Sequence, residues 1–89
     1  MDYKYKPGDA VRVRADLKYN TDYYMRSGPN KDAALIAVSN MVNLAGKIVH
    51  ITDYSASGQY RVEEDSERWR WTDEMFEGST RGIIFQSLL

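Results

Sequence analysis

The chain has 89 residues, of which 43% are hydrophobic and 28% charged, and its formal net charge is −1 at pH 7. This length suits one domain with a limited core, and the composition is that of a globular protein and not of a disordered one. The lack of cysteine excludes disulfides, a thiolate nucleophile and cysteine-ligated zinc. The small net charge excludes a strong overall attraction to nucleic acid or anionic lipid.

The charge is unevenly distributed along the chain. Residues 1–26 carry six basic and four acidic side chains, whereas residues 61–77 carry three basic and seven acidic ones. No apolar run approaches the length of a membrane span, and the first residues lack the apolar core of a secretory signal. We therefore expect a cytoplasmic protein with a mildly basic end and an acidic end.

The first predicted strand follows the turn Lys6–Asp9, where Pro and Gly are adjacent. In residues 10–14, Val11 and Val13 alternate with Arg12 and Arg14, which is the pattern of a half-buried strand. The polar, tyrosine-rich segment 15–30 then predicts a long loop or an irregular hairpin.

A helix is predicted next, beginning at Asn30 or Asp32 and ending near Leu44. Its apolar residues recur at helical spacing, and Gly46 is well placed to end the helix in a left-handed conformation. The predicted stripe consists of Ala34, Leu35, Val38, Met41, Val42 and Ala45.

Three further strands are predicted in the second half, at residues 47–52, 60–63 and 68–72. Turn residues at 55–58 and the charged residues 64–67 separate them, and Thr72 with two following acids indicates a tight turn. Trp71, Met75 and Phe76 are predicted to be core residues. The apolar segment Ile83–Leu89, after a link at 78–82, is predicted to be an added strand, a docked tail or a self-association contact.

Two short motifs, Gly8-Asp9-Ala10-Val11-Arg12-Val13 and Gly46-Lys47-Ile48-Val49-His50-Ile51, resemble the strand pair of small SH3-like barrels of the KOW type. Together with the segment Trp69–Phe76, the chain is similar to small SH3-like proteins of phages and mobile elements of Gram-positive bacteria. This resemblance implies a mainly β, five-stranded SH3-like barrel at residues 1–77, with one helix inserted between the first and second core strands and a tail at 78–89. Most such proteins have no assigned activity, and a fold alone does not specify one.

The candidate partner-binding residues are exposed aromatic side chains and acids. Tyrosines in the loop before the helix suit protein recognition, although they would also serve to cover that helix. Trp69 suits either a binding surface or the core, and the acids suit either a basic partner or a solvated surface. The predicted face consists of Tyr19, Tyr23, Tyr24, Trp69, Glu64, Asp65 and Glu67.

An alternative is a KOW-like nucleic-acid interface in the basic N-terminal half, where cations would contact phosphates. Its predicted residues are Lys4, Lys6, Arg12, Arg14 and Lys18. Catalysis is poorly supported, because His50 is the only histidine and no paired acids or phosphate-binding glycine loop accompany it. We expect no cofactor and no metal.

These observations favour a non-catalytic protein-interaction module. The resemblance to phage proteins suggests a host protein as partner, such as a defence nuclease that the domain inhibits.

Overall fold

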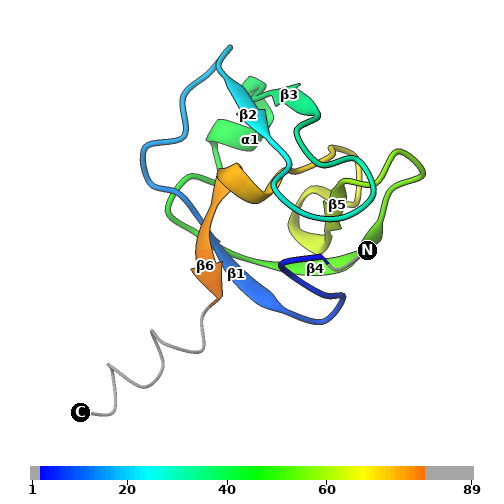
Figure 1. The fold of residues 1–89 in the computed structure, drawn as a ribbon. Helices are drawn as coiled ribbons and strands as arrows, with labels where there is room; N and C mark the ends of the chain where they lie inside the picture. Colours follow the sequence, from blue (N-terminus) through cyan, green and yellow to red (C-terminus); the bar gives the residue numbers. More distant parts are fainter. Residues whose placement is uncertain (1–2, 80–89) are drawn as a thin grey trace.

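Four antiparallel strands form the main sheet of the computed structural model, which describes residues 3–79 (Figure 1). They are β1 (Ala10–Val13), β4 (Ile48–Tyr54), β5 (Tyr60–Val62) and β6 (Phe76–Ser79), in the spatial order β5-β4-β1-β6. The predicted alternation in the first strand is confirmed, because Val11 and Val13 are fully buried in β1.

A second, two-stranded antiparallel sheet consists of β2 (Asp22–Tyr24) and β3 (Ala34–Ile36). Tyr23 lies opposite Leu35 in this hairpin. An isolated two-stranded hairpin is marginally stable in water, so it depends on packing against the rest of the domain. Met25, the residue after β2, supplies part of that packing because its side chain is fully buried.

The predicted helix is much shorter than expected. Only α1 (Ser39–Val42) is α-helical, and residues 34–36 form β3 instead. The apolar residues at helical spacing were misleading, because pairing with β2 recruits Ala34 to Ile36 into a strand. Met41 is the buried residue of α1. Gly46 adopts the predicted left-handed conformation, with a φ of 78°, but it does not end the helix, since α1 ends at Val42 and its C-cap is Asn43.

Two 3₁₀ helices, η1 (Glu63–Asp65) and η2 (Asp73–Met75), lie between β5 and β6. In the predicted strand 68–72, Trp71 forms a single antiparallel bridge to Tyr60. The core assignments are confirmed: Trp71 and Met75 are fully buried, and the Trp71 ring stacks on Phe76 at 5.7 Å between centroids.

The described residues therefore form a mainly β domain with a small, open antiparallel sheet and one α-helix between β1 and β4. This confirms the coarse fold class, whereas the five strands of the predicted barrel are not paired into one closed sheet. Strand β6 extends through Gly78 and Ser79, which were predicted to belong to a link. The predicted self-association segment Ile83–Leu89 lies outside the described residues.

Candidate functional site

The outer side of the β2–β3 hairpin gathers most of the exposed apolar surface within residues 3–79. Strand alternation turns Tyr23 and Leu35 toward the core and leaves Tyr24 and Ile36 outside. Three of the four large hydrophobic side chains that are exposed lie here: Tyr19 at 66%, Tyr24 at 36% and Ile36 at 51%. We call Tyr19, Tyr24 and Ile36 the hairpin face.

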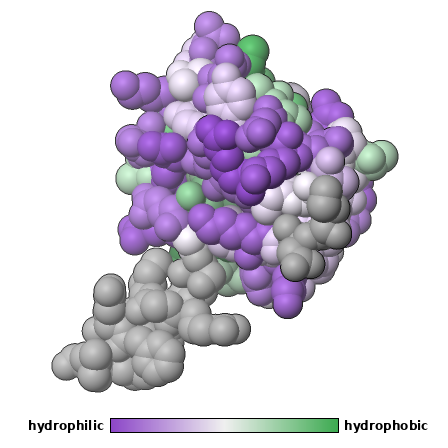
Figure 2. Space-filling view, viewed as in Figure 1, coloured by the Kyte–Doolittle hydropathy of each residue, from purple (hydrophilic) through white to green (hydrophobic). Residues whose placement is uncertain are grey.

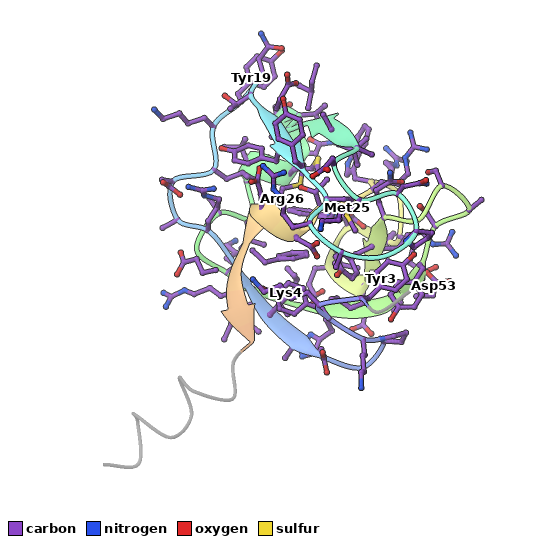
Figure 3. The ribbon with its side chains drawn as sticks, viewed as in Figure 1. Tyr3, Lys4, Tyr19, Met25, Arg26 and Asp53 are labelled. Carbon is purple, nitrogen blue, oxygen red and sulfur yellow. The ribbon has the colours of Figure 1, made fainter. Side chains whose placement is uncertain are left out.

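Backbone hydrogen bonds hold Tyr19 at the Ile36 end of the hairpin. The Asn20 N–H donates to the Ala37 carbonyl at 2.8 Å, and the Ala37 N–H donates to the Thr21 carbonyl at 3.1 Å. Figure 3 shows Tyr19 at the outer end of the hairpin, while Met25 points into the molecule. In Figure 2, green atoms lie beside pale ones at the end of the molecule that carries β2 and β3.

The buried carboxylate of Asp73 ties the hairpin to the core. Asp73 is 3% exposed and accepts hydrogen bonds from the Arg26 backbone N–H at 2.6 Å, the Ser27 hydroxyl at 2.8 Å and the Tyr60 hydroxyl at 2.5 Å. Burial, reinforced by the bond to Asp73, raises the pKa of Tyr60 above its usual range, so this phenol remains a donor. Three donors satisfy the carboxylate and offset the cost of burying it.

Glu74, the next residue in η2, makes a second set of bonds to the hairpin. Its carboxylate accepts from the Tyr24 N–H and from the Arg26 guanidinium, both at 2.9 Å. These bonds, the one from Tyr24 foremost, lower the pKa of Glu74. The Arg26 guanidinium also pairs with Asp32 at 2.8 Å and lies 5.1 Å from the Tyr24 ring centroid. The hairpin face therefore rests on a firmly anchored support.

Tyr23 does not belong to this face, although the sequence placed it there. Its side chain is 6% exposed, because alternation along β2 turns it to the side opposite Tyr24. Its hydroxyl accepts a bond from the Lys18 N–H at 3.0 Å, and the Arg14 guanidinium lies 5.3 Å from its ring centroid. Tyr23 is a core residue with its polar end satisfied.

Trp69 lies in a separate open groove of about 390 Å³ between η1 and the end of α1. Leu44 and Trp69 supply its apolar lining, and Lys47 and Arg68 supply its cations. Glu64 and Asp65 also line this groove, whereas neither Tyr19 nor Tyr24 does. The structure thus places Trp69 and two of the predicted acids together, apart from the hairpin face. Glu67 is exposed on the same loop.

Two of the three predicted acids of this loop, Glu64 and Asp65, make hydrogen bonds within the protein, and their role in partner binding stays a prediction. Asp65 accepts hydrogen bonds from the Trp71 indole N–H at 2.9 Å and from the Trp69 N–H at 3.3 Å. The Glu64 carboxylate accepts a hydrogen bond from the His50 backbone N–H at 2.8 Å and makes a second one with His50 Nδ1 at 2.6 Å. That side-chain bond to Glu64 raises the pKa of His50. Carboxylates with such partners have less capacity left for an external ligand.

The basic residues predicted to contact nucleic acid differ in how free they are. Arg14 pairs with Asp16 at 2.6 Å and also donates to the Glu74 carbonyl at 3.1 Å. Arg12 donates to the Gly46 carbonyl at 3.2 Å, and the Lys4 ammonium lies 5.5 Å from the Tyr5 ring centroid. Lys6 and Lys18 are exposed. Arg14 is thus neutralised locally, and the nucleic-acid interface remains a prediction.

Within residues 3–79, no group of three or more His, Asp or Glu side chains is placed to hold a metal ion. Over the same residues, no helix has the length and apolar character needed to cross a membrane.

Sequence reasoning missed two residues that shape this site, Ile36 and Asp73. The helical pattern predicts Ile36 in the helix, although the preceding Gly28-Pro29-Asn30 is a turn signal that suits a hairpin. The sequence predicts Asp73 only as one of several surface acids. Its burial depends on Tyr60, Ser27 and the Arg26 N–H, which are distant in sequence, so no local signal identifies it.

Comparisons with protein families, curated proteins and solved structures found no match to this chain.

Proposed function

We propose that this chain is a non-catalytic protein-interaction module that binds its partner through the hairpin face. The observation that carries the proposal is the concentration of exposed apolar side chains on one hairpin: Tyr19, Tyr24 and Ile36. Tyrosine is enriched where proteins bind one another, because it buries a large area at a low cost in conformational entropy. The exposed side chain of Ile36 adds to the apolar area that a partner can cover.

The anchoring of the hairpin supports the same proposal. Asp73 and Glu74 fix Arg26 and Tyr24 through bonds of 2.6 to 2.9 Å. A surface that is already ordered loses little conformational freedom on association, so more of the contact energy is retained as affinity.

For the fold, we propose an SH3-like barrel. The antiparallel pairing of β1 with β4 and of β4 with β5 supports it. The η2 turn that leads into β6, and the pairing of β6 with β1, support it as well.

The test is affinity capture with the full chain and two variants. Lysate of a Gram-positive bacterium is the first sample, because the resemblance to phage proteins makes a host protein the proposed partner. We expect Tyr19→Ser combined with Ile36→Thr to lose a partner that the unchanged chain retains. Ile48→Thr is the matched control, since Ile48 is the remaining exposed large hydrophobic residue at 45% and lies on β4. Equal recovery by the double variant would contradict the proposed face.

A further inference from the structure

The two edges of the β2–β3 hairpin differ in how their backbone groups are satisfied. The Met25 N–H donates to the Ala33 carbonyl at 2.8 Å, and the Ala37 N–H donates to the Thr21 carbonyl at 3.1 Å. Bonded and non-bonded pairs alternate in an antiparallel ladder, so Tyr23 and Leu35 form the bonded pair between these two. The N–H and C=O groups of Ala34 and Ile36 therefore point away from β2.

On the β2 side, η2 packs against the strand, and the outward N–H of Tyr24 donates to the Glu74 carboxylate at 2.9 Å. The outward C=O of Tyr24 and the outward groups of Asp22 form no hydrogen bond within residues 3–79, so this edge is covered in part. On the β3 side, the outward groups of Ala34 and Ile36 form no hydrogen bond with any group in residues 3–79. Both residues are exposed, and β3 contains neither a charged residue nor proline, the usual features that protect a strand edge.

We propose that the partner binds as an extended segment that pairs with the open edge of β3. This proposal rests on the proposed function and specifies the partner's conformation. Alternating donors and acceptors on a strand edge are complementary to the backbone of another strand, and adding a strand is a known mode of peptide recognition. The backbone bonds supply affinity, and side chains at every second position of the segment lie beside Ile36 on the outer face.

The side chains of the outer face define the segment's chemistry. Ile36 favours a β-branched or aromatic neighbour, because such cross-strand pairs stabilise sheets. Asp22 lies opposite Ile36, is exposed, and forms no ion pair with another residue in 3–79. It lies two strands, about 10 Å, from the added segment, within reach of a lysine or arginine. The occupant is thus an apolar extended segment that carries a basic residue.

A second copy of this chain fits the edge less well. Strand β3 has three residues and a length of about 10 Å, so pairing two identical edges covers far less than the ~1,200 Å² of a stable interface. An extended segment can continue past both ends of β3 and gain further contacts there.

The experiment selects binders from a random-peptide library on the full chain, then follows amide exchange by NMR with a selected synthetic peptide. We expect the Ala34 and Ile36 amides to exchange rapidly in the free chain and to become protected in the complex. N-methylation of the peptide amides that face β3 is expected to weaken binding about fivefold or more per lost hydrogen bond. Methylation of the alternate amides is expected to have little effect.

The matched protein variants are Ala34→Pro and Leu35→Pro. Ala34→Pro removes an outward N–H and is compatible with an edge strand, so it is expected to weaken peptide binding about fivefold or more in a folded chain. Leu35→Pro removes a bond of the hairpin itself and is expected to disrupt the hairpin. If Ala34→Pro prevents folding, the N-methyl series still decides the question.

Four results would each overturn the inference. The first is peptide binding without protection of the Ala34 and Ile36 amides, and the second is that no peptide is selected. The third is protection of these amides in the free monomer, which would mean that the chain's own residues cover the edge. The fourth is protection that appears only with dimer formation. If the double variant of the hairpin face loses the lysate partner while Ala34→Pro retains it, the proposed function stands and the strand pairing fails.

Discussion

The β2–β3 hairpin and the segment Trp69–Phe76 are both rich in aromatic residues, but they present these residues in opposite directions. The hairpin exposes Tyr24 and Ile36, whereas Trp71 and Phe76 are buried at 0% and 6% exposure. The acids differ in the same way, because Asp73 is enclosed by three donors and Asp22 on the hairpin is exposed. The conspicuous aromatic segment Trp69–Phe76 thus supplies core residues, whereas the less conspicuous hairpin supplies the accessible apolar surface.

The largest expected effect comes from truncating the buried tryptophan. Trp71→Ala is expected to cost about 3–5 kcal/mol of unfolding free energy, because it leaves a large cavity and removes the indole bond to Asp65. Trp69→Ala is the matched control and should cost only ~1–2 kcal/mol, since Trp69 is half-buried. Urea unfolding measures both, and equal losses would show that the two indoles do not differ in role.

The second effect tests whether the two regions depend on each other. Asp73→Ala removes the acceptor shared by Tyr60, Ser27 and the Arg26 N–H, and buried donors without a partner are costly. We expect a loss of about 2–4 kcal/mol, with amides of the hairpin losing exchange protection first. Asp22→Ala, an exposed acid on the same hairpin, should change stability by less than ~0.5 kcal/mol. Similar losses in both variants would contradict the anchoring role.

A smaller effect tests whether the loop acids are engaged within the protein. The bond to Glu64 raises the pKa of His50, so the protonated imidazole is favoured in the folded state. The resulting stabilisation is fully present below the unfolded pKa of ~6.5 and is lost as pH rises through the folded pKa. Because the imidazole is largely exposed, we expect less than about 0.5 kcal/mol.

NMR titration of His50 measures this shift directly. Its midpoint should lie above ~6.5 in the unchanged chain and move down in Glu64→Gln. A midpoint that Glu64→Gln leaves in place would show that Glu64 is not the partner of His50 in solution.

The hairpin face is expected to contribute little to stability. Tyr19→Ser with Ile36→Thr should change the free energy of unfolding by less than ~1 kcal/mol in total, because both side chains are largely exposed. The same pair should remove partner binding. A stability loss as large as that of Asp73→Ala would mean that these residues are structural, and the contrast between the two regions would disappear.

The sequence predicted the strand faces and much of the core, but it was wrong about the helix. Val11, Val13, Trp71 and Met75 are buried as predicted, because alternation and residue size are local properties. Residues 34–36 satisfied the helical pattern equally well, and only the pairing partner on β2 decided for a strand. Short apolar runs are ambiguous in this way.

The amino-acid sequence by itself determined the mainly β class, the buried faces of β1 and the core role of Trp71. The tertiary structure decided which tyrosines are exposed, which acids are engaged and which strand edge is open. The physical reason is that the alternation of apolar and polar side chains along a strand is a property of neighbouring residues. The burial of Asp73 depends instead on donors 13 to 47 positions away. The exposure of the β3 edge depends on which residues pack beside it.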